Sequence, residues 1–153
     1  MADILQINKR KILIIGYGSM GKKYEKILQK DYLIFLHDKK KIEKKKFIKK
    51  FNIFVIKKFY FIIIATPPRY HKKYCDMCVE ASKDFIVEKP LFIKKKGWKK
   101  TILNIKKKKL ICSVAYPRRE SVVHDYIKSI IKKGKIGKLI IIKSNFSQDF
   151  RKL

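Results

Sequence analysis

The chain has 153 residues, of which 41 are Lys or Arg and 12 are Asp or Glu, so its formal net charge is +29 at pH 7. Apolar residues make up 46% of the sequence, as in an ordinary globular protein, which excludes an intrinsically disordered chain. The apolar run at 59–65 is soon followed by Pro67 and Pro68, and no run reaches the roughly 18 to 20 residues of a membrane helix. We therefore exclude a transmembrane protein.

Residues 1–10 are short and polar and lead directly into a strand-like run, which does not resemble a signal peptide. Three cysteines are an odd set in a chain without an export signal, and reduced thiols are typical of that situation. We expect a cytoplasmic protein with no membrane partner.

The positive charge is typical of proteins that bind nucleic acids or anionic surfaces. Only five of the 41 basic residues are Arg, however, and proteins that read bases favour Arg for its planar donor pair. The lysines are spread along the whole chain together with 26 isoleucines, a pattern that AT-rich codons produce. We interpret the charge mainly as compositional bias on solvated faces, and we keep a basic nucleic-acid or anionic-surface binding module as the alternative function.

The first half of the chain alternates apolar strands with helical segments. Lys11 to Ile15 predicts a strand, which is followed by a glycine-rich turn and a helix over 22–30. The next predicted elements are a strand over 32–36, a basic surface helix over 39–50, a short strand over 53–56 and a strand over 59–65. The continuous apolarity of this last strand is typical of a parallel strand buried on both faces.

The second half repeats the alternation. The patterns predict a helix over 69–82, a strand over 84–87, a helix over 97–109, a strand over 110–116, a helix over 121–133 and the start of a strand over 139–142. Such alternation predicts an α/β fold with three layers, in which helices cover both faces of a doubly wound parallel sheet of the Rossmann type.

The glycine-rich turn has the pattern G-x-G-x-x-G between a strand and a helix. Gly16 permits the tight turn, Gly18 lets the backbone approach a pyrophosphate, and Gly21 lets the helix lie close to the strand. The N-terminus of the following helix offers unpaired backbone N–H groups to phosphates, and Ser19 and Met20 of the turn are counted with the cofactor-binding residues. The pattern in this context predicts a dinucleotide-binding site.

Asp38 ends the second strand, 22 positions after Gly16. This is close to the roughly 20-residue offset at which a carboxylate binds the ribose hydroxyls of the adenosine. A carboxylate repels a 2′-phosphate, so Asp38 favours NAD, but Lys39 or Lys40 could pair with that phosphate, which leaves NADP open. The structural alternative is that Asp38 merely caps a helix beginning at Lys39.

Three later segments resemble successive motifs of the Gfo/Idh/MocA oxidoreductases, named after glucose–fructose oxidoreductase and inositol dehydrogenase. They are TPPRYH at 66–71, FIVEKPL at 85–91 and VAYPRR at 114–119, in the family's order after the glycine motif. The segment GKIGKL at 134–139 resembles the loop that leads into the family's second domain. The resemblance covers residues 11–146, is most specific at Glu88-Lys89-Pro90, and implies an NAD(P)-dependent oxidoreductase acting on CH–OH groups.

The resemblance also implies roles for individual residues. Thr66 and Pro67 line the nicotinamide ribose, and Glu88 ends the following strand beside the cofactor. Lys89 lies next to the nicotinamide and the substrate hydroxyl, where a cation stabilises the charge that develops during hydride transfer. Lys89 is therefore the catalytic candidate. The alternative is that Lys89 is an ordinary solvent-exposed lysine without a catalytic role.

Two further residues match the family less specifically. His71 starts the helix after Thr-Pro and is counted with the cofactor-binding residues, although structural hydrogen bonds are its simpler explanation. Arg119 is expected to face the cofactor or substrate side of the cleft, or to form an ordinary exposed pair with Arg118. Cys75 and Cys78 form C-x-x-C without a second Cys/His pair, so we expect small buried residues and no metal site.

Members of the family have a second α/β domain that covers the nicotinamide and supplies substrate contacts. By this resemblance we assign residues 1–119 to the dinucleotide-binding domain and residues 120–153 to the linking helix and first strand of a truncated second domain. His124 and Asp125 come too early in the chain to replace the family's catalytic His and Asp. Whether the chain is an enzyme by itself is therefore left open.

The expected ligand is NAD or NADP, with NAD slightly favoured. We expect the chain alone to turn over little of the sugar, nucleotide-sugar or polyol substrates of the family. A second copy of the chain or a complementing chain is the candidate protein partner, and nucleic acid is not the expected one. A cofactor-sensing or assembly role without chemistry fits the sequence equally well.

Overall fold

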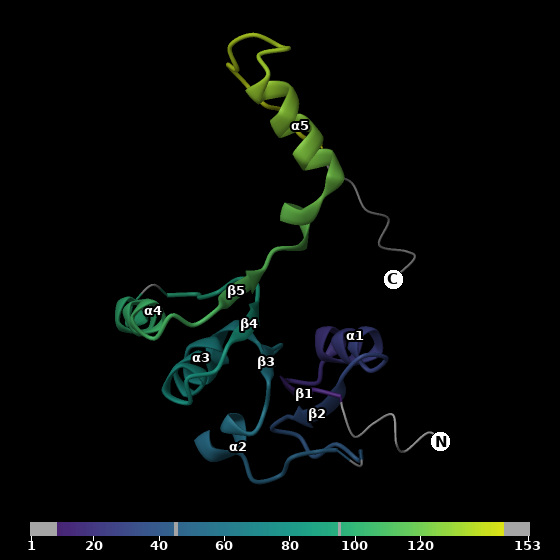
Figure 1. Cartoon of the computed structure of the whole chain (residues 1–153), viewed down its shortest axis with the longest axis vertical. Coiled ribbons are helices and arrows are strands. Elements are labelled where there is room, and N and C mark those ends of the chain that lie inside the picture. The colour runs from purple at the N-terminus through teal and green to yellow at the C-terminus, as the bar shows by residue number, and fades with distance from the viewer. Residues whose placement is uncertain (1–8, 45, 95, 146–153) are drawn as a thin grey trace. The chain divides into compact units, whose positions relative to one another are not determined.

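The computed structural model describes residues 9–44, 46–94 and 96–145. It divides into two units, residues 1–115 and 116–153, and each is described by itself. The strands of the first unit are β1 (Lys11–Ile15), β2 (Leu33–His37), β3 (Phe61–Ile64), β4 (Phe85–Glu88) and β5 (Cys112–Ala115). Its helices are α1 (Ser19–Leu28), α2 (Ile53–Lys57), α3 (His71–Glu80) and α4 (Trp98–Lys107), with a 3₁₀ turn at Pro68–Tyr70 (Figure 1).

The strands form one parallel sheet in the order β2-β1-β3-β4-β5. Ile15 pairs with His37 on one side and with Ile64 on the other, so these strands end at a common edge. The chain order reverses between β1 and β3, and ligands of such sheets bind outside the carboxyl ends of the strands at this reversal. The predicted doubly wound sheet is confirmed.

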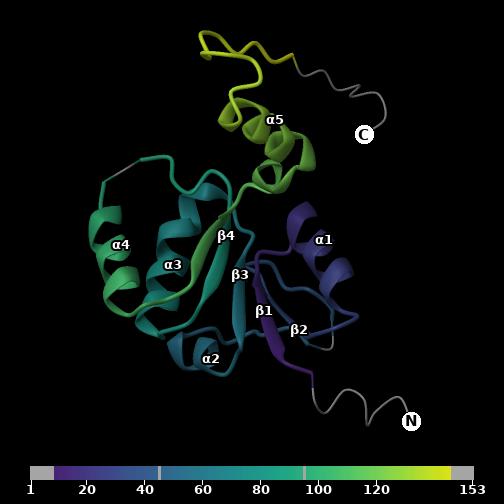
Figure 2. The same cartoon turned by 45° about the horizontal axis from the view of Figure 1, so that its top comes forward.

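The two faces of the sheet are buried by different helices. Leu13 and Ile15 belong to the core cluster that includes residues of α2, α3 and α4. Ile12 and Ile14 belong to the opposite cluster, against which Tyr24 of α1 packs. Figure 2 shows α1 on one side of the sheet and α2, α3 and α4 on the other side. Both faces of β1 are thus buried, as its continuous apolarity predicts.

The segment between β2 and β3 corrects two predictions. No helix forms in the described part of 39–50; instead Phe47 makes a single parallel bridge with Leu36, whose carbonyl oxygen accepts the Ile48 N–H at 2.8 Å. The predicted strand over 53–56 is the helix α2, capped by the Asn52 side chain, which accepts the Val55 N–H at 3.1 Å. Four consecutive apolar residues do not distinguish a strand from a buried helical turn.

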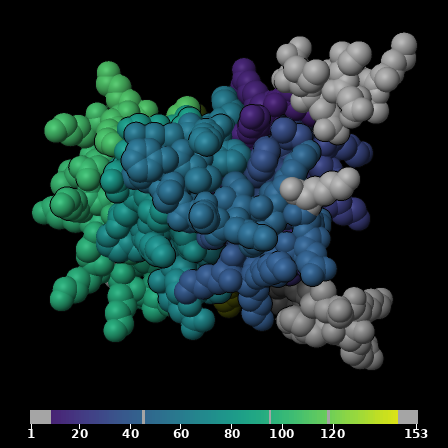
Figure 3. All heavy atoms as spheres, turned by 90° about the horizontal axis from the view of Figure 1, so that it is seen from below, coloured from purple at the N-terminus to yellow at the C-terminus, as the bar shows by residue number. Residues whose placement is uncertain are grey.

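The basic side chains of α4 are a visible case of charge on a solvated face. Lys99, Lys100, Lys106 and Lys107 are exposed, whereas Trp98 and Thr101 on the same helix are buried. In the space-filling view, long side chains of the green part of the chain, which includes α4, stand out from the surface (Figure 3). The narrow buried stripe leaves most of this helix to solvent.

The second unit contains a 3₁₀ turn at Pro117–Glu120 and the helix α5 (Val122–Lys132). The predicted strand over 139–142 is wrong for this structure, because these residues form no strand and Ile140 to Ile142 are exposed. A strand exists only with a pairing partner, and no described strand pairs with this segment. The assignment of 120–153 to a second domain stays a prediction, and residues 146–153 lie outside the described part. None of the described helices combines the length and apolarity that crossing a membrane requires.

Candidate functional site

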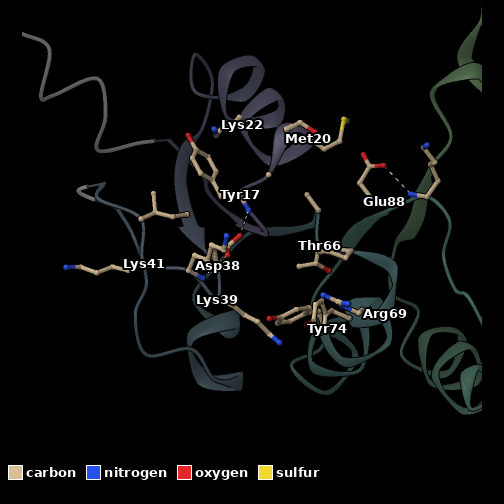
Figure 4. Close-up of a pocket in the computed structure, with 18 residues that line it drawn as sticks. Tyr17, Met20, Lys22, Asp38, Lys39, Lys41, Thr66, Arg69, Tyr74 and Glu88 are labelled. Carbon is tan, nitrogen blue, oxygen red and sulfur yellow. Dashed lines mark hydrogen bonds between the residues drawn. The ribbon is translucent and has the colours of Figure 1, made fainter. Parts of the chain in front are cut away.

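A cavity of about 910 Å³ lies at the carboxyl ends of β1, β2, β3 and β4. Its wall comes from the glycine turn with the start of α1, the loop after β2, the loop after β3 and the end of β4 (Figure 4). The wall includes eight of the residues that the sequence predicts for a cofactor site: Gly18, Ser19, Met20, Asp38, Thr66, Pro67, Glu88 and Lys89. These eight residues, distant in the chain, therefore share one cavity.

The three glycine positions of the turn exclude or tolerate a side chain for different structural reasons. Gly16 has a φ of +95°, and a Cβ there would lie 2.6 Å from the carbonyl oxygen of Ala65. A Cβ on Gly21 would lie 2.1 Å from the carbonyl oxygen of Gly16. Gly18 has an ordinary φ of −76° and nothing within 4 Å of its Cβ position. Gly16 and Gly21 are thus required by the fold, whereas Gly18 leaves open space beside the cavity, which fits close approach of a phosphate.

Asp38 is fixed against the glycine turn by its two carboxylate oxygens. Oδ2 accepts the Tyr17 N–H at 2.7 Å, and Oδ1 accepts the Lys40 N–H at 2.9 Å. No helix begins at Lys39, so the helix-cap alternative is excluded for this segment. Each oxygen keeps a free lone pair, and the carboxylate can still accept hydrogen bonds from ribose hydroxyls.

Glu88 is held from α1 by a residue that the sequence analysis missed. The Tyr24 hydroxyl donates to Glu88 Oε1 at 2.6 Å, and the Lys89 N–H donates to Oε2 at 3.2 Å. Burial, followed by the hydrogen bond to Glu88, raises the pKa of Tyr24 well above its usual value. Tyr24 therefore stays a donor and orients the carboxylate at the cavity. No motif marks this residue, because its partner lies 64 positions away.

His71 does not line the cavity but lies fully buried behind it. Its Nε2 is 2.7 Å from the carbonyl oxygen of Thr66, and its Nδ1 is 3.0 Å from that of Pro90 and 3.3 Å from that of Leu91. The ring thus joins the loop after β3 to the loop after β4. The Thr66 hydroxyl oxygen is buried without a hydrogen-bond partner among the described residues, which fits a donor or acceptor on a bound ligand.

Arg119 belongs to the second unit. Its guanidinium carbon lies 5.7 Å from the centroid of the Tyr116 ring. Its expected position at the cofactor stays a prediction. Lys89, by contrast, lines the cavity beside Glu88.

The glycine turn is tied to the loop after β2 by a small polar cluster. The Tyr17 hydroxyl donates to Glu25, and Lys44 Nζ lies 2.6 Å from the Glu25 carboxylate and 4.9 Å from the Tyr17 ring centroid. Burial acts to raise the pKa of Glu25, but the hydrogen bonds from Lys44 and Tyr17 outweigh it and lower the pKa below its usual value. Glu25 therefore stays ionised and holds this wall of the cavity.

The cavity is electropositive. Six cationic side chains line it: Lys22, Lys39, Lys40, Lys41, Arg69 and Lys89. Only two carboxylates, those of Asp38 and Glu88, accompany them on the described wall. The sequence analysis considered Lys39 and Lys40 but missed Lys41 and Arg69. Lys41 is not distinguished from the many other lysines of the sequence, and Arg69 is far from these lysines in the chain and reaches the same cavity only in the folded structure. A cavity of this charge suits a ligand with phosphate groups.

Cys75 and Cys78 behave as small buried residues, as predicted. Cys75 and Cys78 are fully buried, and burial raises the pKa of both thiols well above the usual value. Burial also raises the pKa of Cys112, to about 11. Within 9–44, 46–94 and 96–145, no group of three His, Cys, Asp or Glu side chains is placed to hold a metal ion.

Comparison with solved structures identifies the fold. The chain is similar to myo-inositol 2-dehydrogenase from Lactobacillus plantarum, with a TM-score of 0.72, 20% identity, and coverage of 87% of this chain and 44% of the other. It is also similar to scyllo-inositol dehydrogenase from Lactobacillus casei, with a TM-score of 0.71, 21% identity, and coverage of 84% of this chain and 43% of the other. A third similar structure is an NAD-binding protein from Listeria innocua, with a TM-score of 0.68, 21% identity, and coverage of 86% of this chain and 42% of the other. The chain thus spans a little over two fifths of the length of these proteins.

No curated protein matches the sequence. Residues 10–116 match the family model GFO_IDH_MocA, described as an oxidoreductase family with an NAD-binding Rossmann fold. The matched range contains the glycine turn, Asp38 and the Glu88-Lys89-Pro90 segment. It supports a nicotinamide dinucleotide as the ligand of this unit. The chain therefore belongs to the Gfo/Idh/MocA oxidoreductase family and carries its NAD-binding Rossmann domain.

Proposed function

We propose that the cavity binds a nicotinamide dinucleotide, with NAD slightly favoured over NADP. The observation that carries the proposal is the open space at Gly18 beside a carboxylate, Asp38, held at the end of β2. Gly18 needs no special backbone conformation, and no atom lies within 4 Å of the position that a Cβ would take there. Room for a ligand is therefore the physical reason that we propose for a residue without a side chain.

The pyrophosphate binds at the start of α1. The first N–H groups of a helix have no partner within it, and the backbone N–H groups of Ser19 and Met20 are therefore free to bind phosphate oxygens. Gly16 and Gly21 shape the turn, and Lys22 adds a positive charge to the wall. Asp38 accepts hydrogen bonds from the ribose hydroxyls of the adenosine.

The nicotinamide end lies between the loops after β3 and β4. Thr66, whose hydroxyl has no hydrogen-bond partner among the described residues, and Pro67 contact the nicotinamide ribose. The bound nicotinamide supplies or accepts a hydride. Lys89 places its ammonium where an alcohol oxygen gains or loses negative charge during that transfer. Glu88, oriented by Tyr24, adjoins it. His71 supports both loops from behind, and Arg119 is assigned to the cofactor or substrate side of the cleft.

The proposed substrate is the hydroxyl group of a sugar, nucleotide sugar or polyol. Two of the similar structures are inositol dehydrogenases, whose names state polyol substrates. We assign the cofactor domain to residues 1–119 and the start of a substrate domain to residues 120–153. Because the chain spans a little over two fifths of those structures, we propose that most substrate contacts come from outside the described residues. The family match favours this function over nucleic-acid binding.

Calorimetric titration of the full chain with NAD at moderate salt tests the proposal. The wild type is expected to bind NAD, and Gly18→Val is expected to abolish binding because the side chain fills the open space. Ser113→Val, at an exposed strand position outside the cavity, is the matched control. Failure of the wild type to bind NAD or NADP, or unchanged binding by Gly18→Val, would contradict the proposal.

A further inference from the structure

Two successive residues of α1 contact elements at opposite ends of the cavity. The Tyr24 hydroxyl donates to Glu88 Oε1 at 2.6 Å, at the end of β4. The Glu25 carboxylate accepts the Tyr17 hydroxyl and lies 2.6 Å from Lys44 Nζ. Successive side chains of an α-helix point about 100° apart, so neighbouring residues can reach different elements. Figure 4 shows Tyr17 and Glu88 to either side of the start of α1.

At the nicotinamide end, Tyr24 engages the carboxylate of Glu88. Glu88 and Lys89 are adjacent in the sequence and both line the cavity, yet no ion pair joins their side chains in the described part of the chain. The two oxygens of Glu88 accept the Tyr24 hydroxyl and the Lys89 N–H instead. Because Glu88 is only 9% exposed, its carboxylate needs another donor when it loses one. Tyr24 therefore keeps Glu88 away from the Lys89 ammonium, which stays free for a ligand.

At the adenosine end, Glu25 acts through Tyr17 and Lys44. The Tyr17 N–H donates to Asp38 Oδ2 at 2.7 Å, and the hydroxyl of the same residue donates to Glu25. Lys44 lies in the loop after β2, and its Nζ is 4.9 Å from the centroid of the Tyr17 ring. Loss of the Glu25 carboxylate would release the Tyr17 hydroxyl and the Lys44 ammonium together. Glu25 thus places both segments that flank Asp38.

We propose that these successive residues of α1 set the two ends of the cavity separately. Tyr24 positions Glu88 and leaves Lys89 free at the nicotinamide end. Glu25 positions Tyr17 and the loop after β2 at the adenosine end. Both are positioning residues, because neither side chain belongs to the described wall of the cavity. This inference rests on the proposed dinucleotide function and adds how each half of the ligand is received.

Titration of the full chain with NAD and with ADP tests the nicotinamide end. ADP contains the adenosine and the diphosphate but no nicotinamide riboside, so the ratio of the two dissociation constants reports on that end alone. Tyr24→Phe keeps the ring and the net charge, and is expected to weaken NAD binding by about fivefold or more and ADP binding by less than about twofold. The matched control is Tyr32→Phe, because Tyr32 packs on the same apolar cluster and does not line the cavity. It is expected to leave both dissociation constants unchanged.

The same two ligands test the adenosine end. Glu25→Ala is expected to weaken NAD and ADP binding by the same factor, about fivefold or more. By charge alone, removing a carboxylate near an electropositive cavity would strengthen the binding of an anion, so weaker binding indicates lost positioning. Glu25→Gln keeps an acceptor for Tyr17 and is expected to recover part of the affinity. Glu80→Ala removes the same charge from an exposed position on α3 and is expected not to weaken either ligand.

Lys44→Ala repeats the test at the adenosine end without a change in α1, at an exposed loop position. It is expected to weaken NAD and ADP binding equally, by about threefold. Equal effects of Tyr24→Phe on the two ligands would overturn the inference, as would unchanged or tighter binding by Glu25→Ala and Lys44→Ala. The dinucleotide function would stand in these cases. Absence of wild-type binding to NAD, NADP and ADP would overturn the proposed function itself.

Discussion

The Nε2 atom of His71 lies 2.7 Å from the carbonyl oxygen of Thr66, a residue of the loop after β3 that lines the cavity. The other ring nitrogen faces Pro90, in the loop after β4. One fully buried ring therefore fixes the separation of the two loops that carry the nicotinamide end of the proposed site. This is a positioning role, since the ring itself does not reach the cavity.

Replacement of His71 with Leu is expected to lower the free energy of unfolding by about 1 to 3 kcal/mol, because buried carbonyl oxygens lose their donor. NAD affinity is expected to fall as well, since Thr66 is no longer held. His71→Gln keeps a donor and is expected to recover part of both losses. Urea denaturation and calorimetry measure the two effects. Full NAD affinity in a destabilised His71→Leu protein would show that the ring serves stability alone.

Replacing Gly16 or Gly18 with Ala is expected to affect different properties, fold stability for Gly16 and dinucleotide binding for Gly18. Gly16→Ala places a Cβ 2.6 Å from the Ala65 carbonyl oxygen at a φ of +95°, so it is expected to destabilise the fold by more than about 1 kcal/mol. Gly18→Ala meets no protein atom within 4 Å and is expected to keep the wild-type stability while weakening dinucleotide binding. Thermal denaturation with parallel calorimetry separates these outcomes. Equal destabilisation by both changes would contradict this assignment.

Tyr24 is expected to make stability depend on pH in the alkaline range. Its pKa is raised in the folded protein above the value of 10.0 for an unperturbed tyrosine, so the folded state favours the protonated hydroxyl. The resulting stabilisation is fully present below about pH 10 and is lost as the pH rises further. Denaturation of wild type and Tyr24→Phe across this range measures the difference. The stability advantage of the wild type over the variant is expected to shrink with rising pH, and a constant difference would exclude this role.

Salt separates the two function classes that the charge of +29 leaves open. Affinity for duplex DNA, where present, is expected to fall steeply between about 50 and 200 mM salt, because phosphate contacts release counterions. NAD binding is expected to persist over the same range, since it also depends on hydrogen bonds and shape at Gly18 and Asp38. Fluorescence titrations with labelled duplex and with NAD check both. Salt-resistant duplex binding that Gly18→Val leaves intact, with no NAD binding, would favour the nucleic-acid class.

Local patterns predicted the part of the fold that forms the phosphate-binding end of the site. The run from Lys11 to Ile15, the three glycines after it and the carboxylate at 38 define a strand, a turn and a second strand end by short-range rules. Residues 66–67 and 88–89 were reached through a family resemblance, and all four line the cavity. Their placement follows from parallel strands ending at one edge.

The failures have a common physical cause, which is that tertiary pairing overrides short patterns. Phe47 pairs with Leu36 although it follows a run of lysines. The apolar residues 53–56 form a helix because Asn52 caps it and Ile56 is buried. The contact of Lys39 with Tyr70 and the hydrogen bond of Tyr24 with Glu88 join distant segments. Such contacts leave no periodic signal in a sequence so rich in lysine.

The bridge between Leu36 and Phe47 helps to hold the loop after β2 in place before a ligand binds. The bridge closes the base of the loop that runs from Asp38 past Lys41, and the Lys44–Glu25 ion pair ties the same loop to α1. The turn in which Asp38 accepts the Lys40 N–H fixes its beginning. These three contacts hold the loop in place before a ligand binds. Binding of a dinucleotide therefore costs little conformational entropy of this loop, and more of the interaction energy remains as affinity.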